Sequence, residues 1–154
     1  MIKLEKVLLE EKELLFRLLQ FALYDGSLYN TNKIGSDGLF PYKWFDNYFT
    51  DDDREAFFIR DDDKIVGFVM INQFMKKCDN GHSVAEFLVL PEYRRNHIGK
   101  KVAFLVFDMY PGNWEVEPIE ESNEACCFWE NVVINYTDNN YDFSDGIYVF
   151  KKYS

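Results

Sequence analysis

Residues 88–100 read Leu-Val-Leu-Pro-Glu-Tyr-Arg-Arg-Asn-His-Ile-Gly-Lys, and they join the end of an apolar strand pattern to the start of a helical one. Backbone N–H groups at a helix start have no partners within the helix, and the helix dipole favours negative charge there. Arg94 and Arg95 come just before that start, and Gly99 lets a ligand approach the backbone closely. The stretch therefore predicts a diphosphate-binding turn, with a solvated loop and an ordinary helix cap as the alternative.

Hydrophobic spacing along the rest of the chain predicts strands and helices in a defined order. We expect a strand at residues 2–7, a helix ending near Asp25-Gly26, a loop at 29–41, a short helix at 42–49, strands at 55–59, 65–71 and 83–90, a helix at 99–109, a strand at 114–116, a helix at 124–136, and strands at 141–143 and 147–151. This mixture is typical of an α/β sandwich, a mixed central β-sheet flanked by helices. The 154 residues contain no linker or repeat, so residues 1–154 are expected to form a single domain.

Charge and composition narrow the classes of partner. The formal net charge is −10, so neither a nucleic acid nor a membrane surface is expected to bind, because both attract basic patches. A cationic substrate suits this charge better, unless the acidic residues serve only solubility. No apolar run is long enough to span a bilayer and the N-terminus lacks a signal-peptide pattern, so we expect a cytoplasmic protein. A homodimer is an alternative that the sequence leaves open.

Other kinds of site have no support in the sequence. The chain has no Gly-x-x-x-x-Gly-Lys-[Ser/Thr] P-loop, and the single glycine of residues 88–100 does not make a dinucleotide fingerprint. His82 and His97 are not spaced as metal ligands and no Cys-x-x-Cys accompanies them, so we expect no metal site. Residues 42–49 are rich in aromatic side chains, which either lie beside a substrate or fill the edge of the core.

Residues 88–100 resemble motif A of the GNAT superfamily, the acyl-CoA-dependent N-acyltransferases. Its pattern is a strand, then [Gln/Arg]-x-x-Gly-x-[Gly/Ala], then a helix; Arg94 and Gly99 match its outer positions, and His97 replaces the first glycine. Downstream, residues 108–116 resemble a helix-to-strand connection of a bacterial GNAT subgroup. Residues 121–129 resemble the family's Asn-x-x-Ala-x-x-[Phe/Leu]-Tyr motif. The order of elements matches the GNAT fold across nearly the whole chain.

The resemblance implies that acetyl-CoA is the co-substrate and indicates where it binds. The strand before motif A splays from its neighbour in this family, so the backbone of Phe87, Leu88 and Val89 is expected to pair with pantetheine. One backbone N–H there would polarise the thioester carbonyl. The diphosphate-binding residues implied by the motif are Arg94, Arg95, Asn96, His97, Ile98, Gly99 and Lys100. Ser122 or Asn123 is expected to reach the pantetheine, and Trp129 is expected to belong to the same cofactor site.

The resemblance also implies direct attack of a neutral amine on the thioester, which requires a base and a route for protonating the leaving thiolate. We expect Glu86 or Glu115 to act as the base, through water, unless each is a surface or salt-bridged carboxylate. Trp129 stands where the family has an acidic tyrosine, and its indole N–H is not a usable acid. Either another residue protonates the thiolate or it leaves unprotonated, and Tyr24 is a weaker candidate for acid or substrate contact.

These observations favour an N-acetyltransferase that acts on a primary amine of a small cationic acceptor. A peptide N-terminus or a lysine side chain is the competing acceptor. The replacements at His97 and Trp129 leave a non-catalytic acyl-CoA-binding or sensing domain as an alternative, and a pure interaction module as a third.

Overall fold

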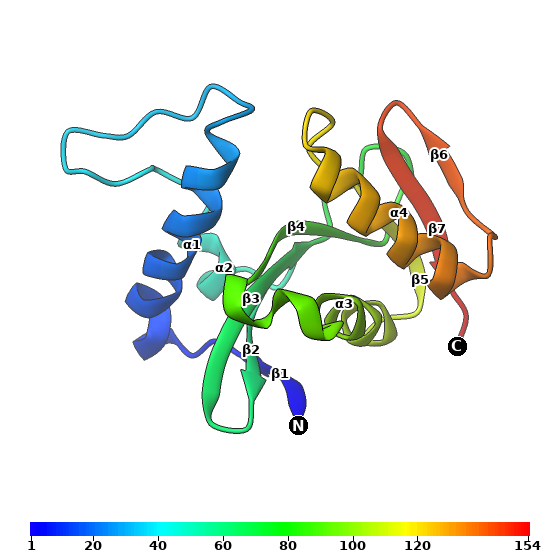
Figure 1. Cartoon of the computed structure of the whole chain (residues 1–154), viewed down its shortest axis with the longest axis horizontal. Helices are drawn as coiled ribbons and strands as arrows, with labels where there is room; N and C mark the ends of the chain where they lie inside the picture. Colours follow the sequence, from blue (N-terminus) through cyan, green and yellow to red (C-terminus); the bar gives the residue numbers. More distant parts are fainter.

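A seven-stranded mixed sheet forms the centre of the molecule, in the order β1-β2-β3-β4-β5-β7-β6 (Figure 1). The computed structural model describes the backbone of residues 1–154 and every side chain except that of Arg95. The strands are β1 (Ile2–Lys6), β2 (Arg54–Asp61), β3 (Lys64–Asn72), β4 (His82–Val89), β5 (Gly112–Val116), β6 (Asp142–Ser144) and β7 (Ile147–Lys152). Neighbouring strands are antiparallel except for β4 and β5, which are parallel. The predicted mixed α/β fold is confirmed.

Helices cover both faces of the sheet (Figure 1). α1 (Lys12–Gly26) and α2 (Asn47–Thr50) share one hydrophobic cluster with β2, β3 and β4, whereas α3 (Ile98–Asp108) and α4 (Asn123–Thr137) share the other with β2 to β5 and β7. Two short 3-10 helices, η1 (Leu9–Glu11) and η2 (Pro91–Asn96), precede α1 and α3. No helix among the described residues is both long and apolar enough to cross a bilayer.

The aromatic residues 42–49 form less helix than the sequence predicts. Their helical part begins only at Asn47, and residues 43–46 before it lie in turns. Phe45 and Tyr48 are buried in the cluster beneath α1, where they complete the core. Tyr42 lies at the edge of the same cluster, and its hydroxyl group faces the site described below.

The two parallel strands separate shortly after they meet. β4 pairs with β5 only at His82 with Trp114 and at Ser83 with Glu115, although β4 continues to Val89. The β3–β4 register shifts between Met70 and Ile71, which leaves Ala85 of β4 without a partner in β3. Such a bulge bends a strand and increases its twist. β4 and β5 therefore diverge as the arms of a fork, as the GNAT resemblance implies.

Candidate active site

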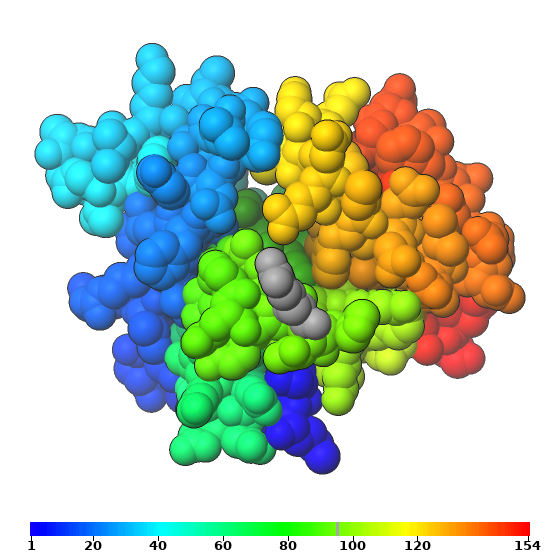
Figure 2. Space-filling model, viewed as in Figure 1, coloured from blue at the N-terminus to red at the C-terminus, as the bar shows by residue number. Residues whose placement is uncertain are grey.

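A cavity of about 580 Å³ opens in the fork between β4 and β5. In the space-filling view the surface is hollowed between the blue end of α1 and the yellow segment that leads into α4 (Figure 2). The lining residues come from α1 and the loop after it (Ala22, Asp25, Gly26, Leu28, Tyr29), from β4 (Glu86, Phe87, Leu88, Val89), from the turn into α3 (Arg94, Gly99) and from α4 with its approach (Ile119, Ser122, Glu124, Ala125, Phe128, Trp129). Segments that lie far apart in the sequence therefore converge on one cavity.

The free edge of β4 faces this cavity. The N–H of Leu90 donates to the carbonyl oxygen of Val66 at 2.8 Å, which sets the phase of the β3–β4 ladder. Alternate residues of an antiparallel strand direct their peptide groups to opposite sides. The peptide groups of Phe87 and Val89 therefore point away from β3, into the fork, where β5 no longer pairs with β4. These are groups with which an extended ligand can form strand-like hydrogen bonds.

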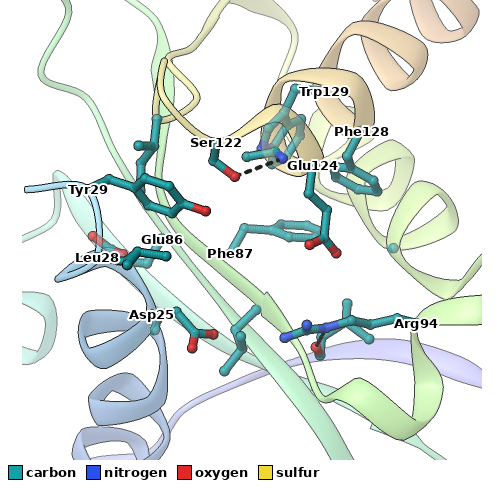
Figure 3. A pocket seen from close by; sticks show the side chains of 17 residues that line it. Asp25, Leu28, Tyr29, Glu86, Phe87, Arg94, Ser122, Glu124, Phe128 and Trp129 are labelled. Atoms are coloured by element: carbon teal, nitrogen blue, oxygen red, sulfur yellow. Dashed lines mark hydrogen bonds between the residues drawn. The ribbon is translucent and has the colours of Figure 1, made fainter.

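Arg94 is tied to the end of β4. Its Nε donates to the carbonyl oxygen of Val89 at 2.7 Å, and its guanidinium group projects into the cavity (Figure 3). That bond occupies the Val89 carbonyl and leaves the other guanidinium donors directed at the cavity. A guanidinium group held in this way is suited to binding phosphate oxygens. The side chain of Arg95, expected to share this role, lies outside the described part of the structure.

The start of α3 supplies backbone donors beside Arg94. The N–H of Lys101 donates to the carbonyl oxygen of His97 at 3.2 Å and closes the first turn, so the three preceding amides have no partner within the helix. His97 has a φ of 59°, in the left-handed region where the family motif has glycine. Neither its exposed imidazole nor the exposed Asn96 lines the cavity. The backbone turn of the motif therefore forms without glycine at position 97.

Gly99 has a packing reason to be glycine. A Cβ atom at this position would lie 2.9 Å from Cε1 of Phe128, closer than side chains pack. The expected reason was close approach of a ligand; the structure shows that the glycine also lets α4 approach α3. Ile98 is buried in the core under α3, and the Lys100 ammonium group lies 5.9 Å from the centre of the Phe104 ring.

Aromatic rings and the start of α4 form the wall opposite Arg94. The rings of Phe87 and Trp129 meet edge to face, with centroids 5.0 Å apart, and Phe128 packs against both. Ser122 caps α4, because its hydroxyl oxygen accepts a hydrogen bond from the N–H of Ala125 at 3.2 Å (Figure 3). Of the two residues expected to reach the pantetheine, Ser122 lines the cavity and the exposed Asn123 does not.

Glu86 brings a carboxyl group into the cavity from β4. Burial raises the pKa of Glu86 to about 7, and a hydrogen bond from the Tyr42 hydroxyl to its Oε2, at 3.1 Å, opposes that rise. A carboxyl group with a pKa near neutrality is suited to exchanging protons at physiological pH. The sequence pattern indicated Glu86 but not its partner Tyr42, which is 44 residues away.

Glu115 has a different environment and does not line the cavity. Its carboxylate accepts hydrogen bonds from the backbone N–H groups of Lys76, Lys77 and Cys78 at 2.8–2.9 Å. Burial alone would raise the pKa of Glu115, but these three bonds outweigh it and lower the pKa. Because both oxygens are engaged, this carboxylate is suited to holding the β3–β4 connection rather than to proton transfer. Its predicted role as a base therefore has no geometric support.

Tyr24, the weaker candidate for acid or substrate contact, does not belong to the site. Its side chain is 69% exposed on α1 and does not line the cavity, whereas Asp25 and Tyr29 do (Figure 3). The only sequence signal for these two was their place at the end of the predicted first helix and in the polar loop after it. The described residues also contain no cluster of three or more His, Cys, Asp or Glu side chains placed to bind a metal ion.

Comparisons with known proteins identify the family. A comparison with curated sequences finds no match, whereas the model of the acetyltransferase (GNAT) family matches residues 22–127, more than half of the chain.

Among solved structures, an acetyltransferase from Thermus thermophilus has a TM-score of 0.68 at 15% identity and covers 97% of this chain and 96% of its own. An aminoglycoside acetyltransferase from an uncultured soil metagenomic sample, in complex with sisomicin, has a TM-score of 0.60 at 14% identity, with 85% and 86% covered. A ribosomal-protein-alanine N-acetyltransferase from Brucella melitensis has a TM-score of 0.59 at 18% identity, with 84% and 89% covered. The likenesses to these structures concern the fold; the family match, over residues that include both the fork and the motif A turn, shows that this chain belongs to the GNAT acetyltransferase family.

Proposed function

We propose that this protein transfers the acetyl group of acetyl-CoA to a primary amine of a small cationic acceptor. One observation carries the proposal: the carboxyl group of Glu86 and the free edge of β4 face the same cavity, at the place where β4 and β5 diverge. A co-substrate bound along that edge would end beside a group able to accept a proton.

The residues around the fork fit an acyl-CoA ligand. Bound acetyl-CoA supplies an activated thioester, and the N–H and carbonyl of Phe87 and the N–H of Val89 are the groups for pairing with its pantetheine. The aromatic wall with Trp129 and the cap residue Ser122 would enclose that chain. Arg94 and the amides of residues 98–100 at the start of α3 suit the diphosphate, as do the neighbouring Lys100 and, from the sequence, Arg95, Asn96 and His97.

Glu86 is the proposed general base. Its carboxylate takes a proton from the acceptor's ammonium group, directly or through water, and so produces the neutral amine that can attack. A C–N bond then forms as the C–S bond breaks, and the peptide N–H groups of Phe87 and Val89 are the donors available to the developing oxyanion. The proton released from nitrogen goes to the leaving thiolate or to solvent, so the products are the N-acetyl amine and CoA.

The leaving thiolate needs no dedicated acid in this proposal. Trp129 has no acidic proton to give, and an ordinary thiol has a pKa near 8.5, so a thiolate is an acceptable leaving group near neutral pH. Tyr29 is the only phenol among the described lining residues, and its hydroxyl group points into the cavity (Figure 3).

Charge in the cavity favours a cationic acceptor. The carboxylates of Asp25, Glu86 and Glu124 line it, against a single guanidinium group from Arg94 among the described side chains. The net charge of −10 extends this field over the molecule and would attract a cation. An aminoglycoside, as in the name of the soil-derived neighbour, is one such cation. A protein N-terminus, as in the name of the Brucella neighbour, or a lysine side chain is the competing acceptor.

The proposal is tested by offering acetyl-CoA with a panel of amines and measuring CoA release with a thiol reagent. The panel contains polyamines, aminoglycosides, a lysine peptide and a peptide with a free N-terminus. We expect the small polycations to give the highest kcat/KM. Tight binding of acetyl-CoA in calorimetry with no transfer to any amine would instead indicate an acyl-CoA-binding or sensing domain, and no binding at all would overturn both functions.

A further inference from the structure

The Glu86 carboxyl group is held at one of its two oxygens. The Tyr42 hydroxyl donates to Oε2 at 3.1 Å. Oε1 accepts no hydrogen bond from any described residue. It is not fully buried either, so it remains accessible. The two oxygens therefore differ: Oε2 is bound by the Tyr42 hydroxyl, whereas Oε1, on a residue that lines the cavity, has no donor among the described residues.

Tyr42 is itself held in place by α1. Its loop, residues 27–46, is joined to Gln20 by a pair of hydrogen bonds: Gln20 Nε2 donates to the carbonyl oxygen of Phe40 at 2.9 Å, and the Phe40 N–H donates to Gln20 Oε1 at 2.7 Å. Tyr42 follows two residues later and packs against the cluster of α1 and α2. The rings of Tyr42 and Tyr48 lie with their centroids 6.4 Å apart, and Tyr48 is buried in that cluster.

We infer that Tyr42 is a positioning residue for Glu86: its hydroxyl group fixes the carboxyl group so that Oε1 faces the acceptor, and the Gln20–Phe40 pair holds Tyr42 in register. The kinetic part of this inference rests on the proposed function, in which Glu86 is the base. Tyr42 does not line the cavity, so its effect on the reaction passes through Glu86. It acts by orienting Glu86 and by stabilising its ionised form.

The pH dependence of activity can be interpreted from the charged and titratable groups around Glu86. The titratable and charged groups near it are Asp25 of α1, Tyr29 and Tyr42 of the following loop, Tyr48 of α2, Arg94 after β4 and Glu124 of α4. Burial raises the pKa of Glu86, and the Tyr42 hydrogen bond lowers it. Removing the hydroxyl therefore raises the pKa further. Because the carboxylate is the active form, activity is present above this pKa and is lost as the pH falls through it.

The test compares Tyr42→Phe with the wild type by two measurements. The first follows the carboxyl carbon of Glu86 by NMR in the free protein, with the signal assigned through Glu86→Gln. The second follows kcat/KM against pH. We expect both the titration and the acidic limb to move upward by about one pH unit in Tyr42→Phe, the size expected for a lost hydrogen bond to a charged group.

Two further variants distinguish the positioning of Glu86 by Tyr42 from a general disturbance of the structure. Gln20→Ala keeps the Tyr42 hydroxyl but removes its support, so we expect a smaller shift in the same direction; this variant also decides the matter if Tyr42→Phe does not fold. Tyr110→Phe is the matched control, because Tyr110 also donates to a carboxylate, that of Glu55, and does not line the cavity. It should leave both curves unchanged.

Negative results from the two measurements would contradict different claims. An unchanged Glu86 titration in both Tyr42→Phe and Gln20→Ala would overturn the positioning role, whatever the kinetics. A shifted titration with an unmoved acidic limb would support the contact but overturn Glu86 as the base, and with it the proposed mechanism.

Discussion

Among single residues, the two glutamates near the fork show how the surroundings shift the pKa values of identical side chains in opposite directions. Burial raises the pKa of Glu86 to about 7, and its single neutral donor, the Tyr42 hydroxyl, offsets only part of that rise. Glu115 accepts three backbone N–H groups, and these lower its pKa despite burial. Glu115, with three fixed donors, is suited to stabilising the chain around it. Glu86, with one oxygen free of donors, is suited to exchanging a proton.

Glu86→Gln is expected to lower kcat by roughly 10²–10⁴-fold, the usual contribution of a general base, while the Kd for acetyl-CoA stays nearly constant. The amide keeps the shape of the side chain but cannot accept the proton. Steady-state kinetics and calorimetry on the same preparation separate the two effects. Full turnover in this variant would exclude Glu86 as the base.

Glu115→Gln is expected to destabilise the fold by about 2 kcal/mol, since the side-chain amide has only one acceptor oxygen and at least one of the three backbone N–H groups loses its acceptor. Because the folded pKa of Glu115 is lowered, its contribution is present above the unfolded pKa and is lost as the pH falls through the folded pKa. Urea unfolding at neutral and acidic pH measures this. The control is Glu117→Gln, an exposed ion-pair partner of Lys76, which should cost less than about 1 kcal/mol. Equal effects from both variants would contradict the assignment.

Arg94→Ala is expected to weaken acetyl-CoA binding by about 10–100-fold without unfolding the protein, because an exposed charged donor is lost. Adding Arg95→Ala should weaken binding further. Arg94→Lys keeps the charge but lacks Nε, which anchors the group to Val89, so its affinity should lie between those of the wild type and Arg94→Ala. Lys101→Ala, an exposed position outside the cavity lining, serves as the control. An unchanged Kd in Arg94→Ala would count against the diphosphate assignment.

At the level of elements, the contact between α3 and α4 depends on the absence of a side chain at position 99. Gly99→Ala places a methyl group against the Phe128 ring, and we expect a loss of about 1–3 kcal/mol from overpacking. The double variant with Phe128→Leu should recover part of that loss, and a double-mutant cycle of unfolding free energies measures the coupling. Additive effects would show that the two residues do not compete for the same space.

For the molecule as a whole, the fork lets one cavity reach both faces of the sheet. Phe87 and Val89 belong to or pack against the core beneath α3 and α4, whereas Leu88 belongs to the core beneath α1. Glu86 shares that α1 side with Tyr42. In the proposed reaction, acetyl-CoA would therefore approach from the side of α3 and α4, and the acceptor from the side of α1.

Binding of acetyl-CoA should then stabilise the entire fold. A ligand that binds only the folded state raises the free energy of unfolding by about 2.7 kcal/mol at a hundredfold excess over Kd. Chemical unfolding with and without acetyl-CoA measures this increase. The Arg94→Ala variant at the same ligand concentration should show a smaller one. No increase at saturating ligand would mean that the cavity does not bind acyl-CoA.

The sequence by itself determined the order of strands and helices, and with it the mixed α/β fold, because apolar spacing follows from which face of each element is buried. It also indicated the turn at Arg94 to Gly99, since motif A is local in the chain. Only the tertiary structure joined Tyr42 to Glu86 and the Glu115 carboxylate to the backbone at residues 76–78, and only it set Phe128 against Gly99. These contacts link residues 29 to 44 positions apart, and their geometry depends on a β-bulge, a splayed strand pair and a loop held by Gln20. Local hydrophobic patterns carry no information about such long-range contacts.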